Sequence, residues 1–256
     1  MAMDEGRNLL VGVSLTQNDE SEGIGGISEE EMLAKSMTFQ VAMMASDGWV
    51  LASDTCAFDP YMARALDDTV MVSIRSPTRK IVHRSELSLT YAFSGGSLAR
   101  RAGLTLEDGL RNGVVQPPDR AAFLNECLTK TAQQYKDERP GGSLLVIFDS
   151  IAMPEIWTVD FGRTAVSRTD LAFGGGGNLA MLFPQRYYVR APVDRLKFLA
   201  AHTILEAHVF NPSVVDGLEV WSGKNGQIEQ APEAEIDGFK KRSAEIHKRI
   251  GKLVIA

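Results

Sequence analysis

The sequence predicts an α+β domain in which antiparallel sheets carry helices on their outer faces. Two hairpin signals support this prediction, because Asp47-Gly48 and Asn225-Gly226 each separate two runs of β-forming residues. The order of the elements is the second observation, since short strands joined mainly by hairpins alternate with pairs of helical segments. Strands that are joined by hairpins run antiparallel, which leaves the outer faces of the sheets for the helices.

Residues 1–37 are expected to be a leader or propeptide, disordered or absent from the mature chain. They are rich in Gly, Ser and Glu and poor in aromatic residues, so they bury too little apolar surface to order a chain. A secretory signal is not indicated, because Asp4 and Glu5 stand where such a signal carries positive charge. Residues 38–256 are therefore expected to form one domain.

The domain begins with a hairpin whose strands flank Asp47-Gly48, followed by an irregular stretch up to Lys80. Period-2 and β-rich patterns predict later strands at 80–84, 87–96, 141–150, 155–161, 165–174 and 217–230. Helical spacing predicts helices at 97–113, 117–139, 175–183, 193–210 and 235–251. In the second of these helices Pro118 is expected in the first turn.

Composition excludes several functions for this 256-residue chain. The net charge of −6 and the absence of long Lys/Arg runs argue against nucleic acid or an anionic membrane as partner. No apolar stretch reaches the ~20 residues that a membrane span requires. The chain has only two cysteines, Cys56 and Cys127, so we do not expect a disulfide framework. This cysteine content predicts a cytoplasmic location.

No cofactor or metal is expected from the motifs. The sequence lacks HExxH, CxxC and GxSxG patterns, and its four histidines lack metal-ligand spacing. One kind of amide-hydrolase active site that needs no histidine remains, namely a Thr at a free chain end. Its α-amine, with a pKa near ~8, can act as general base for its own hydroxyl. Such a site needs a nearby ammonium to lower the amine pKa and a carboxylate to hold that ammonium.

Four segments together resemble consecutive signatures of proteasome β-type subunits, which are N-terminal-nucleophile hydrolases. They are MTFQVAMMASDGWVLASDT, TRKIV, LTYAFSGGSLARRAG and LAFGGGGNLA. The sequence resembles most the bacterial threonine peptidases called betaproteobacterial proteasome homologues. The resemblance implies a four-layer αββα sandwich of two antiparallel sheets. It also implies a threonine-type endopeptidase acting on unfolded polypeptide inside a homo-oligomeric double ring, with an AAA+ unfoldase as partner by analogy only.

The family's catalytic positions fall on Thr38 as nucleophile, Asp54 and Lys80 as the charged pair, and Gly95 as the oxyanion N–H donor. Taken alone, Thr38 would be a strand starter, Asp54 a turn residue and Lys80 an edge charge. The resemblance also implies a substrate pocket and support for the amine. The pocket positions are Ala57, Phe58, Thr78, Phe93 and Ser97, and the support positions are Gly175, Asn211 and Ser213.

The sequence departs from the family pattern at three places. Phe58 stands where the family has a Thr, and Gly175 stands where many members have a Ser near the amine. The stretch between Asp54 and Lys80 is longer than in the family, which predicts a lengthened loop. Thr38 also needs a free amine, either by translation from Met37 or by removal of the leader. A non-catalytic ring subunit of the same fold, or a small-molecule amidase, is the alternative.

Overall fold

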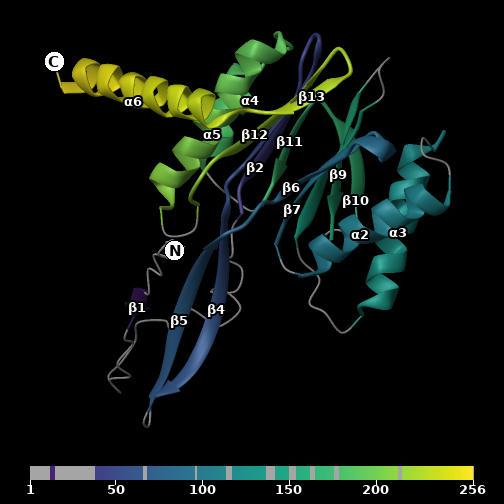
Figure 1. Cartoon of the computed structure of the whole chain (residues 1–256). Coiled ribbons are helices and arrows are strands. Elements are labelled where there is room, and N and C mark those ends of the chain that lie inside the picture. The colour runs from purple at the N-terminus through teal and green to yellow at the C-terminus, as the bar shows by residue number, and fades with distance from the viewer. Residues whose placement is uncertain are drawn as a thin grey trace, which may run out of the picture.

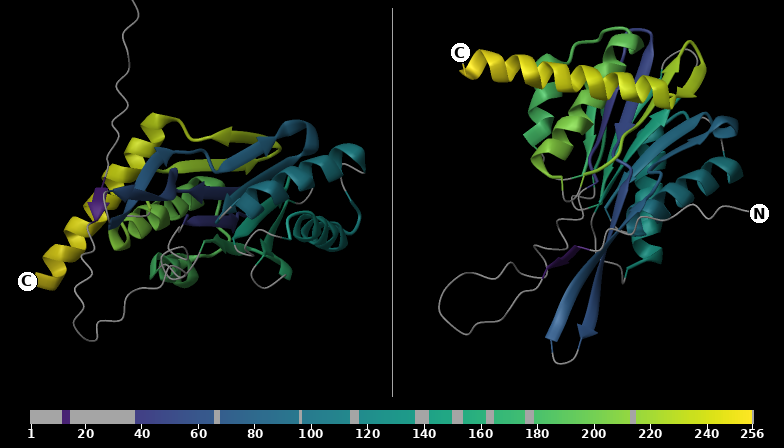
Figure 2. Two further views of the ribbon diagram at one scale, coloured as in Figure 1. Left: turned by 90° about the horizontal axis from the view of Figure 1, so that it is seen from below. Right: turned by 60° about the vertical axis from the view of Figure 1, so that its left-hand side comes forward.

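The computed structural model describes residues 12–14, 38–65, 68–95, 97–113, 117–136, 142–149, 154–161, 165–175, 179–212 and 215–255. Two five-stranded antiparallel sheets pack face to face, and helices cover both outer faces (Figures 1 and 2). This arrangement confirms the predicted α+β class and the αββα sandwich. No helix among the described residues is long and apolar enough to cross a membrane.

The first sheet has the strand order β11-β2-β3-β12-β13. Its strands are β2 (Gln40–Met44), β3 (Gly48–Ser53), β11 (Leu171–Gly174), β12 (Glu219–Lys224) and β13 (Gln227–Gln230). The β12–β13 hairpin turns at Asn225 and Gly226, whose φ angles of 53° and 78° are both left-handed. A two-residue turn of this kind matches the twist of the flanking strands, which explains the Asn-Gly pair.

The second sheet has the strand order β10-β9-β8-β7-β6. Its strands are β6 (Ile81–Arg84), β7 (Leu89–Ser94), β8 (Ser143–Phe148), β9 (Glu155–Asp160) and β10 (Ala165–Thr169). The short 3-10 helix η1 (Ser85–Leu87) connects β6 to β7. All neighbours in this sheet are sequential antiparallel pairs, as the run of hairpin-like segments predicts.

Helices α2 (Ser97–Asn112) and α3 (Arg120–Gln134) cover the second sheet. The first sheet is covered by η2 (Leu179–Met181), α4 (Leu182–Tyr187) and α5 (Val193–Phe210), with α6 (Glu233–Ile255) packed on α5. The expectation for Pro118 is wrong, because α3 begins at Arg120 behind the N-cap Asp119. The Asp119 side chain accepts the Ala122 N–H, so Pro118 lies before the cap.

The interior divides into three hydrophobic layers, as a four-layer sandwich requires. One cluster fills the space between the first sheet and α5, and a second lies between the second sheet and α2 and α3. The third lies between the sheets and includes Ala42, Leu51, Ile81 and Leu145. Because side chains alternate along β2, Val41 and Met43 face α5 while Ala42 and Met44 face the other sheet. Gln40 therefore points between the sheets.

The long stretch of chain that connects β3 of the first sheet to β6 of the second sheet is a β-hairpin rather than the predicted loop. Strands β4 (Cys56–Ala65) and β5 (Asp68–Pro77) pair antiparallel along their whole length and project from the body (Figures 1 and 2). Within residues 1–37 the structure describes only β1 (Gly12–Ser14), which pairs antiparallel with β5. The prediction of a leader there otherwise concerns residues outside the described part of the chain.

Candidate active site

Thr38 and Asp54 lie together at one end of the first sheet because of how β2 and β3 pair. Thr38 precedes β2 and Asp54 follows β3, and Gln40 is opposite Ser53 in the ladder. The N–H of Phe39 donates to Oδ1 of Asp54 at 2.9 Å, and the N–H of Asp54 donates to the Phe39 carbonyl at 3.1 Å. The carboxylate of Asp54 is therefore fixed to the peptide group that follows Thr38.

Lys80 and Gly95 occupy the matching end of the second sheet. Lys80 precedes β6 and Gly95 follows β7, and these strands pair antiparallel with Ile81 opposite Ala92. The N–H of Phe93 also donates to the Lys80 carbonyl at 3.3 Å. Lys80 reaches across to the first sheet, where its Nζ lies 2.6 Å from Oδ2 of Asp54. This ion pair joins the two sheets directly beside the strand that begins after Thr38.

The ion pair is shielded from solvent, and this determines its electrostatics. Asp54 is 0% exposed and Lys80 is 3% exposed. Burial raises the pKa of Asp54 and lowers the pKa of Lys80, because it disfavours the charged form of each group; their mutual attraction opposes both shifts. Asp54 also accepts the N–H of Cys56 at 3.3 Å, which helps to hold the carboxylate ionised. A buried cation of lowered pKa is thus available near Thr38.

Two glycines at this end adopt left-handed backbone conformations. Gly95 has φ of 90° directly after β7, and Gly175 has φ of 88° directly after β11. A Cβ added to Gly175 would lie 1.7 Å from the carbonyl oxygen of Thr38. The glycine turn after β11 therefore packs against the backbone of Thr38 in a way that no other residue permits.

Polar side chains that the sequence motifs do not indicate link these elements. The Gln40 Nε2 donates to the Phe93 carbonyl at 2.8 Å. One residue further, Ser94 Oγ lies 2.7 Å from Ser143 Oγ, which in turn accepts the N–H of Gly175 at 3.4 Å. Together the contacts connect β2, β7, β8 and β11 around Thr38. The sequence signal that could have indicated Gln40 is its polar side chain within the otherwise apolar strand segment FQVAMM.

The predicted pocket residues belong to elements that begin or end near this end of the sandwich. Ala57 and Phe58 lie near the start of β4, opposite Ser76 and Arg75, and the side chains of these two, like that of Ser97, are outside the described part. The Thr78 N–H donates to the Thr55 carbonyl at 2.7 Å, beside Asp54. The assignment of these residues to a pocket stays a prediction.

The side chain and the backbone carbonyl of Phe93 face different layers of the sandwich. Its side chain packs in the hydrophobic cluster under α2 and α3, and its carbonyl faces Gln40 between the sheets. Asn211 follows the end of α5. Asp216 lies beside the site, where its carbonyl accepts the Thr55 N–H at 2.9 Å. Ser213 lies outside the described residues.

Comparison with known proteins identifies the fold. No protein-family model and no curated protein sequence matches the chain. Among solved structures, Anbu, described as an ancestral beta-subunit, from Yersinia bercovieri is similar. It has a TM-score of 0.65 and 13% identity, over 85% of this chain and 97% of that one. The Anbu (Gly-1) mutant from Hyphomicrobium sp. strain MC1 gives a TM-score of 0.64 and 9% identity, over 84% and 96%.

The fold is the proteasome-like N-terminal-nucleophile hydrolase sandwich. The sequence-based assignment to the proteasome β-type threonine peptidases, closest to the betaproteobacterial homologues, is wrong as a family assignment. No family model supports it, and both of these similar structures are Anbu chains. At 9–13% identity the likeness extends to the fold and not to an activity. The left-handed backbone at Gly95 and Gly175 requires glycine there, so motifs built on these glycines indicate local geometry rather than a particular family.

Proposed function

We propose that this chain is an N-terminal-nucleophile hydrolase that cleaves peptide bonds, with Thr38 as the nucleophile. The observation that carries the proposal is the buried Asp54–Lys80 ion pair, held at 2.6 Å and bonded to the backbone next to Thr38. A buried pair of this kind costs desolvation free energy, and an apolar pair would fill the same space at lower cost. A cation beside the start of β2 is what a terminal threonine requires.

In the proposed mechanism the Thr38 hydroxyl attacks the substrate carbonyl and its proton passes to the Thr38 α-amine. The Lys80 ammonium lowers the pKa of that amine by like-charge repulsion, so that more of it is neutral near pH 7. The backbone N–H of Gly95 donates to the oxyanion, an interaction worth roughly 10²–10³ in rate. The amine then protonates the departing amino group, which leaves an ester that water hydrolyses.

The substrate class that we propose is unfolded polypeptide. The charged pair lies where the projecting hairpin β4–β5 leaves the body, and the first strand of this hairpin begins two residues after Asp54. An extended chain can lie along such strands through backbone hydrogen bonds. Assembly into stacked rings, with delivery by an AAA+ unfoldase, belongs to this proposal as an expectation from the fold.

A second candidate is a non-catalytic subunit of the same fold. It is favoured by the pairing of Gly12–Ser14 with β5, because a leader that forms a strand on the hairpin has a reason to remain attached. With residues 1–37 attached, the nitrogen of Thr38 is an amide and cannot act as the base. The domain boundary before Thr38 is therefore part of the proposal.

Two measurements on the purified protein separate these candidates. Intact mass spectrometry reports whether chains begin at Thr38, and a peptide epoxyketone tests the chemistry, since the warhead needs both the hydroxyl and the free amine. We expect an adduct on the wild-type chain and none on Thr38→Ala. A chain that begins at Thr38, is folded and forms no adduct would refute the peptidase, whereas a chain that keeps its leader would support the non-catalytic subunit.

A further inference from the structure

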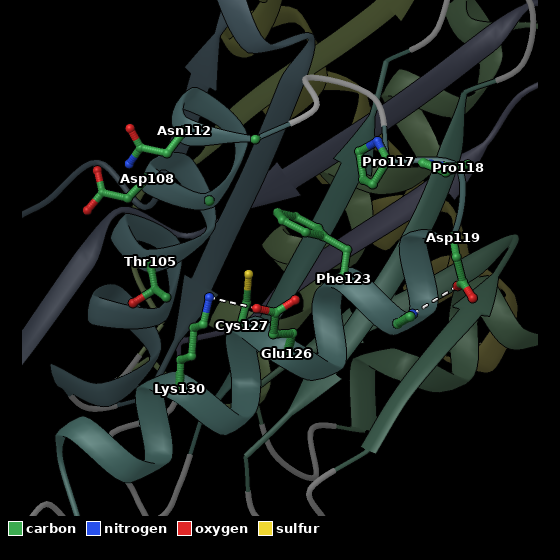
Figure 3. A pocket seen from close by; sticks show the side chains of 13 residues that line it. Thr105, Asp108, Asn112, Pro117, Pro118, Asp119, Phe123, Glu126, Cys127 and Lys130 are labelled. Carbon is green, nitrogen blue, oxygen red and sulfur yellow. Dashed lines mark hydrogen bonds and ion pairs between the residues drawn. The ribbon is translucent and has the colours of Figure 1, made fainter.

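A groove runs along the outside of the molecule between α2 and α3, remote from the candidate active site. It has a volume of about 630 Å³ and is open to solvent (Figure 3). Apolar side chains form its floor, among them Phe123, Cys127 and Pro117. Phe123 is only partly covered, although it packs against the cluster between these helices and the second sheet. An open trough with an apolar floor is suited to receive a helix.

The rim of this groove is predominantly acidic. Three carboxylates line it, from Asp108, Asp119 and Glu126, against one ammonium, from Lys130. Lys130 already pairs with Glu126 at 2.7 Å, and Asp119 caps α3 (Figure 3). Asp108 lies 3.8 Å from the Arg111 guanidinium on the same helix. Asp108 is nevertheless 72% exposed and Glu126 is 61% exposed, so both can also meet an incoming cation without moving a buried group.

The C-terminal end of α6 has the complementary character. Its first half is anchored on α5, where Ser243 bonds to His202 at 2.9 Å. Three residues past the midpoint, His247 pairs with Glu206 of α5. Beyond His247 the helix carries Lys248, Arg249 and Lys252, which are exposed and make no ion pair with any described residue. Ile250 lies among them and is 48% exposed. This end is a basic stretch of helix that presents an apolar residue to solvent.

The two features lie on opposite sides of the molecule. In Figure 1 and in both views of Figure 2 the end of α6 projects from one side, while α2 and α3 form the other. One chain therefore cannot bring its own α6 into its own groove. A projecting helix and a receiving groove on opposite sides define a head-to-tail contact between copies.

We propose that the α2–α3 groove binds the C-terminal end of α6 from a second copy of this chain. The end of that helix lies over the floor at Phe123 with Ile250, and its basic residues meet Asp108 and Glu126. Each chain then offers one helix end and one groove, so the contact repeats from chain to chain. Repetition gives a closed ring where the rotation closes and a helical filament where it does not.

A charge-reversal series tests this interface without any assay of peptide cleavage, so the result is independent of the chemistry at Thr38. The tail variant is Lys248→Glu with Lys252→Glu, and the groove variant is Asp108→Lys with Glu126→Lys. Lys240→Glu with Lys241→Glu is the matched control, because it changes the same net charge at exposed positions in the anchored half of α6. Sedimentation velocity gives the assembly state, and circular dichroism verifies folding.

We expect the wild-type chain and the control to assemble alike, and the tail and groove variants each to weaken self-association at least tenfold. Combining the tail and groove variants in one chain should restore assembly, which a variant that merely misfolds cannot do. A monomeric wild-type chain, or assembly that survives tail reversal, overturns the proposal. So does assembly that survives groove reversal, which would assign the groove to another occupant.

A cross-link locates the contact directly. In a Cys127→Ser chain, Ile250→Cys combined with Asn112→Cys places thiols on the helix end and on the groove lining. Mild oxidation should produce a ladder of covalent multimers, and Lys241→Cys with Asn112→Cys should produce none. If the chain stays monomeric under oxidation, or if the control forms the same ladder, the proposed binding of α6 in the groove is contradicted.

Discussion

The N–H of Phe39 donates a 2.9 Å hydrogen bond to the same carboxylate of Asp54 that pairs with Lys80 at 2.6 Å. One side chain thereby sets the position of the backbone after Thr38 and of the buried cation. The two contacts use different oxygens of that carboxylate. Substitutions in this unit, and in the elements that hold it, therefore have distinguishable effects.

Replacing Asp54 by Asn should reduce kcat by about 100-fold and destabilise the fold by about 3–5 kcal/mol, since Lys80 is left as an unpaired buried cation. Asp54 raises the pKa of Lys80 against the effect of burial, so its removal lowers that pKa further. The loss of activity at alkaline pH should therefore begin at a lower pH in the variant. If the alkaline limb of the pH–rate profile is the same in the variant and the wild type, the loss of activity at high pH does not arise from deprotonation of Lys80.

Replacing Gln40 by Met should reduce kcat about 10-fold with little change in KM, because the Phe93 carbonyl loses its donor and the turn at Gly95 can shift. Thr131→Val is a matched control, since it removes a buried side-chain hydrogen bond to the Cys127 carbonyl in α3. The control should lower the melting temperature and leave kcat unchanged. Equal kcat in the two variants would mean that Gln40 serves stability alone.

Replacing Gly175 by Ala should abolish activity in a chain that still folds. The new Cβ would lie 1.7 Å from the Thr38 carbonyl oxygen, so that the backbone of the nucleophile must move. Gly226→Ala adds comparable left-handed strain, of about 1–2 kcal/mol, at the distant turn between β12 and β13. Epoxyketone labelling should persist in Gly226→Ala and be absent in Gly175→Ala, and labelling of both would argue against a tight fit at Thr38.

Replacing Glu107 by Gln should remove an acid-sensitive contribution to stability. Burial acts to raise the pKa of Glu107, but hydrogen bonds from Arg84 and Tyr91 outweigh it and the pKa falls below the ordinary 4.5. The folded chain thus binds fewer protons than the unfolded chain, so this stability is present above pH 4.5 and is lost as pH falls through the lowered value. Urea unfolding at several pH values should show a shallower acid decline in the variant than in the wild type.

Local signals explain which parts of the fold could be predicted from sequence. The β2–β3 and β12–β13 hairpins carry Asp-Gly and Asn-Gly turns, and the helices carry apolar faces such as Leu124 and Leu128 in α3. The β4–β5 hairpin was missed because Pro60 interrupts its first strand. Strand β4 is an edge strand, ordered β1-β5-β4, and an edge tolerates a residue without an N–H.

The site shows the same division. The placement of Thr38 beside Asp54 follows from one hairpin, which the sequence indicates directly. The contacts of Gln40 with Phe93, and of Ser94 with Ser143, depend on how two sheets stack and on registers set far away in the chain. No periodicity encodes such contacts, and a resemblance in short motifs suggested a family that the comparisons do not support.

The β4–β5 hairpin has a mechanical consequence for the charged pair. Its strands start two residues after Asp54 and end three residues before Lys80, and the bond from the Thr78 N–H to the Thr55 carbonyl, 2.7 Å long, closes its base. No slack loop intervenes on either side. The hairpin is therefore held on both sides within a few residues of the carboxylate and the ammonium, and a mechanical load on its strands reaches the backbone that carries those two charges.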